Sequence, residues 1–494
     1  MCSGSLSLSP GTAAQRSPLI NASPAARCVA LAASLLLGAC DQKPVPEKAP
    51  TVPLAASTPA VPLIARGAAA RLDAKPAPLS AVALLGKQMF YDATLSGSGK
   101  LSCSSCHDPD HAYAPGNGLP VQLGGHTMRL QGLRSVPSLT YRERTPVFSI
   151  DPDTKPDADD HSPATVGIPA SQTNAKLPSV AKIAATGEAD RSANASSTAA
   201  PEMVPQGGMD WDGRASMLSE QAGGPLLDPN EMANDSGKEL LAKLKRASYA
   251  PQMVQLFGPA VFSSPNLALG EAYFALARYQ IEERSFHPYD SKFDYYLAAR
   301  APLNAQELRG MQLFDDPKKG NCAACHPDKP SKDGRLAPLF TDFQFEALAA
   351  PRNPHIKANR DPRFFDEGLC GPIRKDTTGQ AQYCGLFKTP SLRNVATQRV
   401  FFHNGVFRSL RDVVRFYVER ETRPEKWYPR MADGSIDMYN DIRSANRVNV
   451  DLLDAPFDRK RGQTPALTET EIEDVVAFLQ TLTDGYQPAS SMQP

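Results

Sequence analysis

The sequence has no excess of charge of either sign. Lys plus Arg and Asp plus Glu number 53 each among 494 residues, so the formal net charge is zero at pH 7. Nucleic-acid-binding domains usually carry a basic surface, and proteins that bind anionic membranes by charge alone need a polybasic segment. We therefore expect no nucleic-acid partner and no charge-driven membrane binding.

Long hydrophobic runs are also scarce. One such run, CVALAASLLLGA at residues 28–39, follows Arg27 and is too short to span a bilayer. With the next residue it ends in LGAC, which resembles a bacterial lipobox with Cys40 as the lipidated first residue of the mature chain. An ordinary signal peptide is the alternative. Residues 1–39 thus predict a lipoprotein-type signal, export to the periplasm and an anchor through Cys40.

Composition predicts the division of the remaining chain. Residues 40–75 are rich in Pro and Ala, and we expect a tether that does not pack. Two units are predicted to follow, over 76–300 and 301–485. Residues 142–206, rich in Asp, Pro, Ala and Ser, predict an insertion at the surface of the first unit, partly disordered.

Cysteine is sparse, and its spacing is informative. Four of the nine lie in two C-x-x-C-H motifs, Cys103-Ser-Ser-Cys106-His107 and Cys322-Ala-Ala-Cys325-His326. This is the attachment signature of c-type haem, in which the thiols bind the two vinyl groups and the His supplies an axial nitrogen. A thioredoxin-like redox pair would not need the His, and a zinc site would need further ligands nearby. The motifs predict two covalently attached haems.

Two further cysteines, Cys370 and Cys384, flank a loop. In an oxidising compartment a structural disulfide is the preferred interpretation, and a regulatory thiol pair is the alternative.

A helix signal precedes each haem motif. Residues 78–91 predict a short helix before the first, and Asn304 with Glu307 forms a capping box for LRGMQLF before the second. Thr468 and Glu471 form another box that opens a C-terminal helix. The repeated order of helix, loop and C-x-x-C-H predicts a mostly α protein with two tandem cytochrome-c-like haem domains and long loops.

Tryptophan is rarer still, with two in the chain. One of them, Trp211, lies between the haem motifs and is followed at ten-residue intervals by Gln221 and Glu231. A haem that activates peroxide needs an acid–base group beside its open face, and Glu231 is a candidate. Taken alone, Glu231 also fits a surface carboxylate at a helix start, and Trp211 an ordinary core aromatic.

Residues 409–420 predict an amphipathic helix whose apolar face includes Tyr417. Leu410, Val413, Val414 and Tyr417 recur at helical spacing. Tyr417 is therefore expected to face inward, where a phenol usually finds a hydrogen-bond partner. By itself it fits a core residue with a satisfied hydroxyl.

Together these motifs resemble the bacterial dihaem cytochrome c peroxidase/MauG superfamily. The resemblance spans roughly 80–483 and is carried by CSSCHDP, WDGRASMLSEQAGGPLLDPNEM, GNCAACHPD, LFTDFQFEALAAPRNP and KTPSLRNV followed by HNG. It implies a peroxide-reactive first haem, a six-coordinate second haem and an intervening Trp at Trp211. Gln221 and Glu231 match residues that line the distal pocket, and Pro225 matches a distal position of the MauG branch.

The same resemblance gives Tyr417 a role. In the family the second axial ligand of the second haem comes fourteen residues after the His of the HNG or HDG motif, which here leads from His403 to Tyr417. Peroxidases that take electrons from small cytochromes carry Met there, whereas the MauG branch carries Tyr. A thioether stabilises ferrous iron, whereas a hard phenolate stabilises ferric and higher states.

The resemblance implies that hydrogen peroxide is reduced at the first haem and that the second haem shares the oxidising equivalents through Trp211. Electrons would come from a small cytochrome, a cupredoxin or a protein substrate. One alternative is a conventional cytochrome c peroxidase in which Tyr417 belongs only to the core. Another is a non-catalytic dihaem electron carrier or redox sensor.

Two features depart from the family pattern. His126 lies one residue away from the position of a distal His, and His111 is closer to the first motif; a loop His is the simpler interpretation of both. The Asn that binds the family's interhaem calcium is replaced by Ser135, although Gln398 and Val400 keep the positions that provide carbonyls. Calcium is therefore an open expectation.

Overall fold

The computed structural model describes residues 62–152 and 203–488. The predicted signal peptide, Cys40 and most of the insertion lie outside these residues. Helices dominate the described part. The α-helices are α1 (Leu63–Asp73), α2 (Ala81–Phe90), α3 (Cys103–Cys106), α4 (Leu218–Leu227), α5 (Gly237–Arg246), α6 (Ala250–Phe257), α7 (Pro265–Glu282), α8 (Lys292–Leu297), α9 (Ala305–Asp315), α10 (Leu410–Glu419) and α11 (Glu469–Gln480).

The strands of the described residues pair into small antiparallel sheets. β1 (Leu123–Gly124) pairs with β2 (Leu130–Gln131), and β3 (Ser149–Pro152) with β4 (Met203–Gln206). β5 (Phe345–Glu346) pairs with β6 (Phe387–Lys388). The β3–β4 pair joins the two ends of the predicted insertion. The mostly helical prediction therefore holds, with little extended structure.

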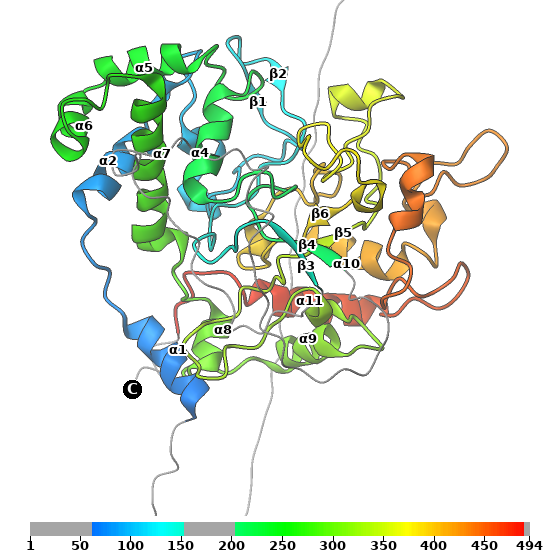
Figure 1. The fold of residues 1–494 in the computed structure, drawn as a ribbon. Coiled ribbons are helices and arrows are strands. Elements are labelled where there is room, and N and C mark those ends of the chain that lie inside the picture. The colour runs from blue at the N-terminus through cyan, green and yellow to red at the C-terminus, as the bar shows by residue number, and fades with distance from the viewer. Residues whose placement is uncertain (1–61, 153–202, 489–494) are drawn as a thin grey trace, which may run out of the picture. The chain divides into compact units, whose positions relative to one another are not determined.

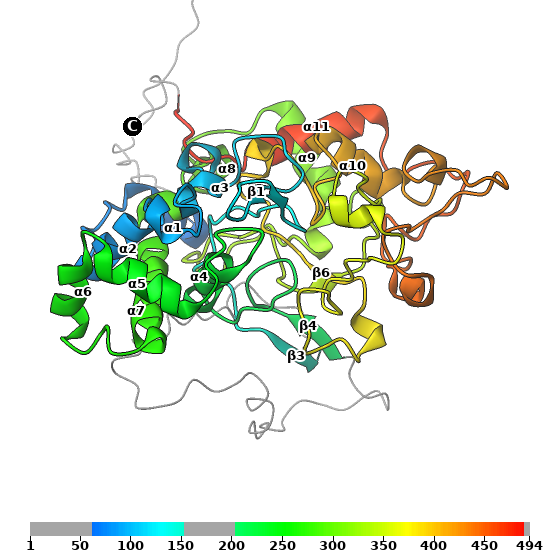
Figure 2. The ribbon, with the colours of Figure 1, turned by 90° about the horizontal axis from the view of Figure 1, so that it is seen from above.

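The helices gather around two hydrophobic cores. α2, α4, α5, α6 and α7 surround a first core that includes Phe90 and Tyr279, and they lie together in both views (Figures 1 and 2). α9, α10 and α11 surround a second core that includes Phe314 and Phe478. Phe293 of α8 packs in this second core, although it precedes residue 301, where the second unit was predicted to begin.

Helix α1 corrects the tether prediction for its last part. Residues 63–73 form a helix that packs against α8, with Ala65 and Ala68 buried. Arg71 fixes its end by donating to the carbonyl of Gly334 at 2.8 Å. No helix of the described residues is both long and apolar enough to cross a bilayer.

A glycine lets the helix before each haem motif approach a later helix. A Cβ on Gly86 of α2 would lie 1.9 Å from the carbonyl oxygen of Ala275 in α7, and a Cβ on Gly310 of α9 would lie 1.9 Å from that of Asp474 in α11. The two glycines occupy the same place in the related stretches LLGKQMF and LRGMQLF. Each core thus has the same helix crossing ahead of its C-x-x-C-H.

Replacing Gly310 by Ala is expected to lower the free energy of unfolding by about 1–3 kcal/mol, because the added methyl group forces α9 away from α11. The midpoint of denaturant unfolding measures this. Gly224→Ala in α4 is the control, since an added Cβ there meets no atom within 4 Å. Equal stability of the two variants would contradict the packing argument.

Candidate haem sites and the wall between the cavities

The first C-x-x-C-H motif presents a neutral imidazole. Cys103 to Cys106 form α3, and His107 follows at its end. The Nδ1 atom of His107 lies 3.0 Å from the carbonyl oxygen of Tyr113, which leaves Nε2 free. Burial lowers the pKa of His107 to about 4, with the charge of Arg142 lowering it further. A neutral imidazole with a free nitrogen is what an iron ligand requires.

The second motif repeats this arrangement. Cys322 begins a short 3₁₀ turn, η6 (Cys322–Ala324), and His326 is 8% exposed. Its Nδ1 atom lies 2.8 Å from the carbonyl oxygen of Phe340. Burial lowers the pKa of His326 to about 4. Both histidines are therefore oriented by a backbone carbonyl, as metal-ligating histidines usually are.

The four motif thiols are not in disulfides. Burial raises the pKa of Cys103 and of Cys322 to about 12, so they stay protonated at neutral pH, unlike the thiols of a reactive redox pair. In the described residues no three His, Cys, Asp or Glu side chains are placed to hold one metal ion. The donors of the motifs fit haem, in which the thiols bind the vinyl groups and the His binds the iron.

A large cavity adjoins the second motif. Together with the open space at its mouth it measures about 1520 Å³, and Cys322, Cys325, His326 and Tyr417 line it. The Leu410, Val413 and Val414 side chains of α10 also face this cavity, which confirms the predicted inward face of the helix. A mostly apolar cavity of this size beside a C-x-x-C-H motif is suited to a haem.

The Tyr417 hydroxyl was expected to have a hydrogen-bond partner in the core, and the structure does not show one within the described residues. Its ring packs against Phe402 and Phe457, with centroid distances of 5.9 and 5.6 Å. Burial raises its pKa well above the usual value, and Cys325 and Cys322 raise it further. The phenol thus faces the cavity close to the motif thiols.

A second, smaller cavity measures about 440 Å³ together with the open space at its mouth, and Trp211 and Gln221 belong to its lining. Leu139, another lining residue, donates its N–H to the carbonyl of Tyr113, which is also the His107 partner. Leu139 therefore links the lining of the small cavity to the carbonyl that orients His107.

Trp211, Lys388 and Pro390 line both cavities, and we call these three residues the shared wall. The indole N–H of Trp211 donates to the carbonyl of Ser135 at 2.8 Å. The backbone N–H of Lys388 donates to the carbonyl of Trp211 at 2.9 Å.

Glu231 lies beyond the end of α4, not in the lining of the small cavity. Its carbonyl accepts the N–H of Gly125 at 2.8 Å, which ties it to the β1–β2 hairpin. The residue is accessible to solvent, yet the surrounding protein raises the pKa of its carboxyl to about 7, and Asp228 and Asp210 raise it further. Burial is the main cause that raises the pKa of Cys106, and the charge of Glu231 raises it further. Glu231 is therefore close to the first motif.

A buried ion-pair cluster supports the shared wall. Arg134 pairs with Asp212 and with Asp366, each at 2.7 Å, and the exposed fractions of these side chains are 6%, 0% and 7%. Arg214 is a second partner of Asp212 at 2.9 Å. Because Asp212 follows Trp211 in the chain, the cluster fixes the backbone of the wall. No pattern along the sequence signals this cluster, because Arg134 and Asp366 are 232 residues apart.

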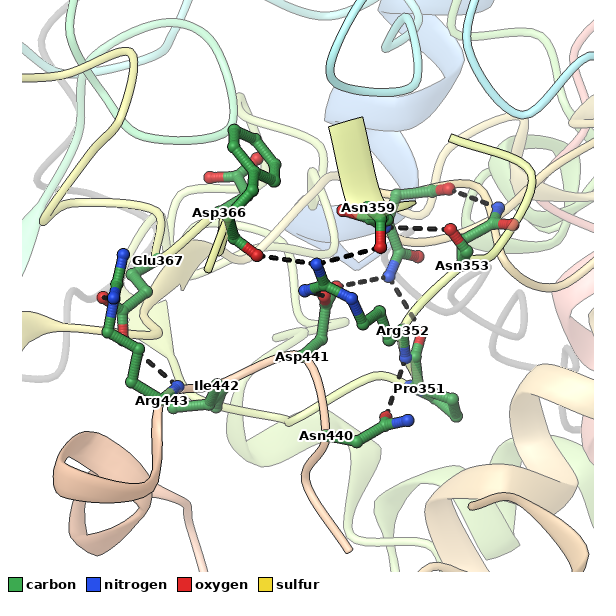
Figure 3. Close-up of polar contacts among 12 residues, drawn as sticks. Pro351, Arg352, Asn353, Asn359, Asp366, Glu367, Asn440, Asp441, Ile442 and Arg443 are labelled. Atoms are coloured by element: carbon green, nitrogen blue, oxygen red, sulfur yellow. Dashed lines mark hydrogen bonds and ion pairs between the residues drawn. The ribbon is translucent and has the colours of Figure 1, made fainter. Parts of the chain in front are cut away.

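Asp441 organises the loop that carries His403. The His403 Nε2 atom lies 3.6 Å from Asp441 Oδ2, and its ring stacks on Phe387 at 3.6 Å. Asn404 and Arg352 donate to Asp441 at 2.9 and 3.1 Å. Figure 3 shows Arg352 beside Asp441 and, as a separate contact, Arg443 beside Glu367. The HNG loop is thus held at the edge of the large cavity, which His403 and Asp441 line.

The two other histidines singled out in the sequence, His126 and His111, pair with carboxylates. His126 Nε2 lies 3.0 Å from Asp235 at the surface, and His111 Nδ1 lies 2.8 Å from Asp108. Neither lines the two cavities described above.

The calcium expectation finds no support. Ser135 donates its N–H to His403 O and its hydroxyl to Phe402 O, and its own carbonyl accepts from Trp211. All its polar groups are engaged, so Ser135 does not fit a calcium ligand.

Cys370 and Cys384 form the predicted disulfide. The loop between them contributes Arg374, which donates to the carbonyl of Asp212 at 2.7 Å.

Fold and site define a mostly helical protein with two sites for covalently attached haem. Residues 80–301 match the family model described as di-haem cytochrome c peroxidase. The chain is similar to methylamine utilization protein MauG of Paracoccus denitrificans, with 29% identity over 84% of this chain and 92% of that protein. It is also similar to the solved structure of the diheme peroxidase BthA from Burkholderia thailandensis, with 36% identity, a TM-score of 0.67, and coverage of 83% of this chain and 87% of that one.

The chain therefore belongs to the dihaem cytochrome c peroxidase/MauG family. As a member of this family it is an oxidoreductase of the haem peroxidase class, with two haem c groups as its cofactors.

Replacing Arg134 by Met is expected to lower the free energy of unfolding by about 3–5 kcal/mol, because Asp366 loses its buried partner and Asp212 loses one of two. The denaturant midpoint is the measurement. Arg335→Met is the control, since its ion pair with Asp333 is 85% and 55% exposed and its loss should leave the midpoint unchanged. If Arg134→Met and Arg335→Met unfold at the same denaturant midpoint, the cluster does not stabilise the shared wall.

Proposed function

We propose that the protein reduces hydrogen peroxide at the haem bound by Cys103, Cys106 and His107, and shares the oxidising equivalents with a second haem. His326 and Tyr417 would hold the iron of that second haem, and Trp211 connects the two sites. We further propose that the chain folds as two cytochrome-c-like haem units, one around each core. The position of Trp211, whose side chain borders both cavities, carries the proposal.

Glu231 supplies the acid–base chemistry. Reduction of peroxide to two waters consumes two electrons and two protons, and the bound haem irons supply the redox chemistry. Glu231 accepts the proton from one peroxide oxygen and returns it to the other as the O–O bond breaks. A carboxyl whose pKa is raised to about 7 can hold and release a proton near neutral pH. The Gln221 amide, in the lining of the small cavity, orients the oxygens by hydrogen bonding.

Trp211 passes an electron without losing its proton. Its indole N–H donates to the carbonyl of Ser135, and an amide carbonyl is too weak a base to accept the proton. The electron moves from the second site, through the indole, to the first.

Tyr417 is proposed as the anionic ligand of the second site. Burial raises the pKa of the phenol, so a phenolate is favoured there only when a cation binds it. The position of the hydroxyl in the large cavity, without a hydrogen-bond partner among the described residues, supports this role. A phenolate favours ferric and higher states, which suits a site that stores an oxidising equivalent.

The electrons come from a small cytochrome, a cupredoxin or a protein substrate. The lipobox-like LGAC predicts an exported protein held at a periplasmic membrane surface through lipidated Cys40. This location agrees with the oxidising conditions in which disulfides persist.

Replacing Tyr417 by Phe is expected to abolish the low-spin six-coordinate EPR signal of the second haem, because the oxygen ligand is lost. Tyr439→Phe is the matched control, since its hydroxyl donates to Glu421 at 2.7 Å and does not face the large cavity. An unchanged signal in Tyr417→Phe would favour the conventional cytochrome c peroxidase, in which this residue only packs.

Replacing Glu231 by Gln is expected to slow peroxide activation by about 10²–10⁴-fold, with the haem content unchanged. Stopped-flow absorbance after addition of one equivalent of peroxide gives the rate. In the unmodified protein this rate should rise with pH through about 7, because the carboxylate form accepts the proton; the rise should vanish in Glu231→Gln. The control is Glu220→Gln, an exposed glutamate whose carboxylate accepts from Ser216 N. Identical rates for the two variants would limit Glu231 to a structural role.

A further inference from the structure

Lys388 is buried between the two cavities. Its exposed fraction is 4%, and it belongs to the shared wall together with Trp211. Its backbone N–H donates to the carbonyl of Trp211, and its ammonium donates to the carbonyl of Gly208. Both ends of the residue are therefore fixed against the segment that carries the tryptophan.

The ammonium of Lys388 has no ion-pair partner within 4 Å among the described residues. The carboxylates near it, Asp210 and Asp212, are engaged by Arg214, and Asp212 also by Arg134. Burial lowers the pKa of Lys388 to about 7, Arg142 lowers it further, and the two carboxylates oppose this. Lysine is almost never fully buried without a partner. A buried ammonium without an ion-pair partner lowers the stability of the fold. Its presence in the lining of both cavities therefore indicates a functional role there.

We propose that Lys388 sets the charge of the shared wall, and that its ammonium controls how readily an electron leaves the second haem through Trp211. This inference rests on the proposed relay role of Trp211. Lys388 touches no substrate and acts on the relay through its electric field.

The direction of the effect follows from Coulomb's law in a medium of low dielectric constant. A fixed positive charge stabilises the reduced, more negative form of each neighbouring redox group, and so raises its reduction potential. It also disfavours removal of an electron from Trp211. When Lys388 loses its proton to solvent, both effects disappear, and the second haem and Trp211 each give up an electron more readily.

The experiment measures the reduction potentials of both haems in the complete holoprotein by spectroelectrochemistry, without peroxide. Lys388→Met removes the charge at nearly constant side-chain length, and Lys388→Arg keeps it at all accessible pH values. The control is Lys243→Met, whose ammonium also donates to a carbonyl, that of Ser96, but pairs with Glu239 and lines neither cavity.

We expect Lys388→Met to lower both potentials relative to the unmodified protein and to Lys243→Met, and Lys388→Arg to leave them high. In the unmodified protein the potentials should fall as the pH rises through the titration of Lys388, and Lys388→Arg should lack this fall. Potentials of Lys388→Met equal to those of Lys243→Met would overturn the proposal. If Lys388→Met does not fold, identical pH profiles for the unmodified protein and Lys388→Arg would overturn it.

Two combinations of results separate a failure of the Trp211 relay proposal from a failure of the Lys388 proposal. If Lys388→Met lowers the potentials but Trp211→Phe does not slow the loss of the second ferric EPR signal after peroxide, then Lys388 acts on the haems and the relay is wrong. If Trp211→Phe slows that loss while Lys388→Met leaves the potentials unchanged, then the relay stands and the role of Lys388 is wrong.

Discussion

The buried pairing of Arg134 with Asp212 and Asp366 is the constraint on which the shared wall depends. It joins segments from both halves of the chain, and the backbone of Trp211 lies directly beside it. A buried ion pair contributes little net stability compared with an apolar contact, but breaking one is costly, so it selects one arrangement sharply. The proposed electron path needs such a fixed arrangement, because Trp211 must border both cavities at once.

The elements that the sequence predicted well are those whose signals are local. The Asn304–Glu307 and Thr468–Glu471 capping boxes open α9 and α11 as expected, since a cap and its target lie three residues apart. The C-x-x-C-H motifs are equally local, and their spacing reflects the dimensions of a single haem. The inward face of α10 followed from helical periodicity alone.

The missed features depend on contacts between distant parts of the chain. Arg134 and Asp366 are 232 residues apart, and Lys388 and Gly208 are 180 apart, so no pattern along the sequence signals either contact. Lys388 was visible in KTPSLRNV, but its burial was not. Helix α1 was missed for a different reason: its alanine-rich sequence suggested a spacer, and it is helical beside α8, where Ala65 and Ala68 are covered.

The Cys370–Cys384 bond has a consequence for maturation. The six cysteines of the described residues must reach two different covalent fates, since four belong to the motifs that attach haem through thioethers and two form a disulfide. A bond between either loop cysteine and a motif thiol would block a thioether to haem, and would also free the loop that delivers Arg374 to Asp212. The loop cysteines are only fourteen residues apart, which favours their pairing over exchange with the distant motifs. The short separation of Cys370 and Cys384 thus helps to keep the four motif thiols available for haem attachment while the protein matures.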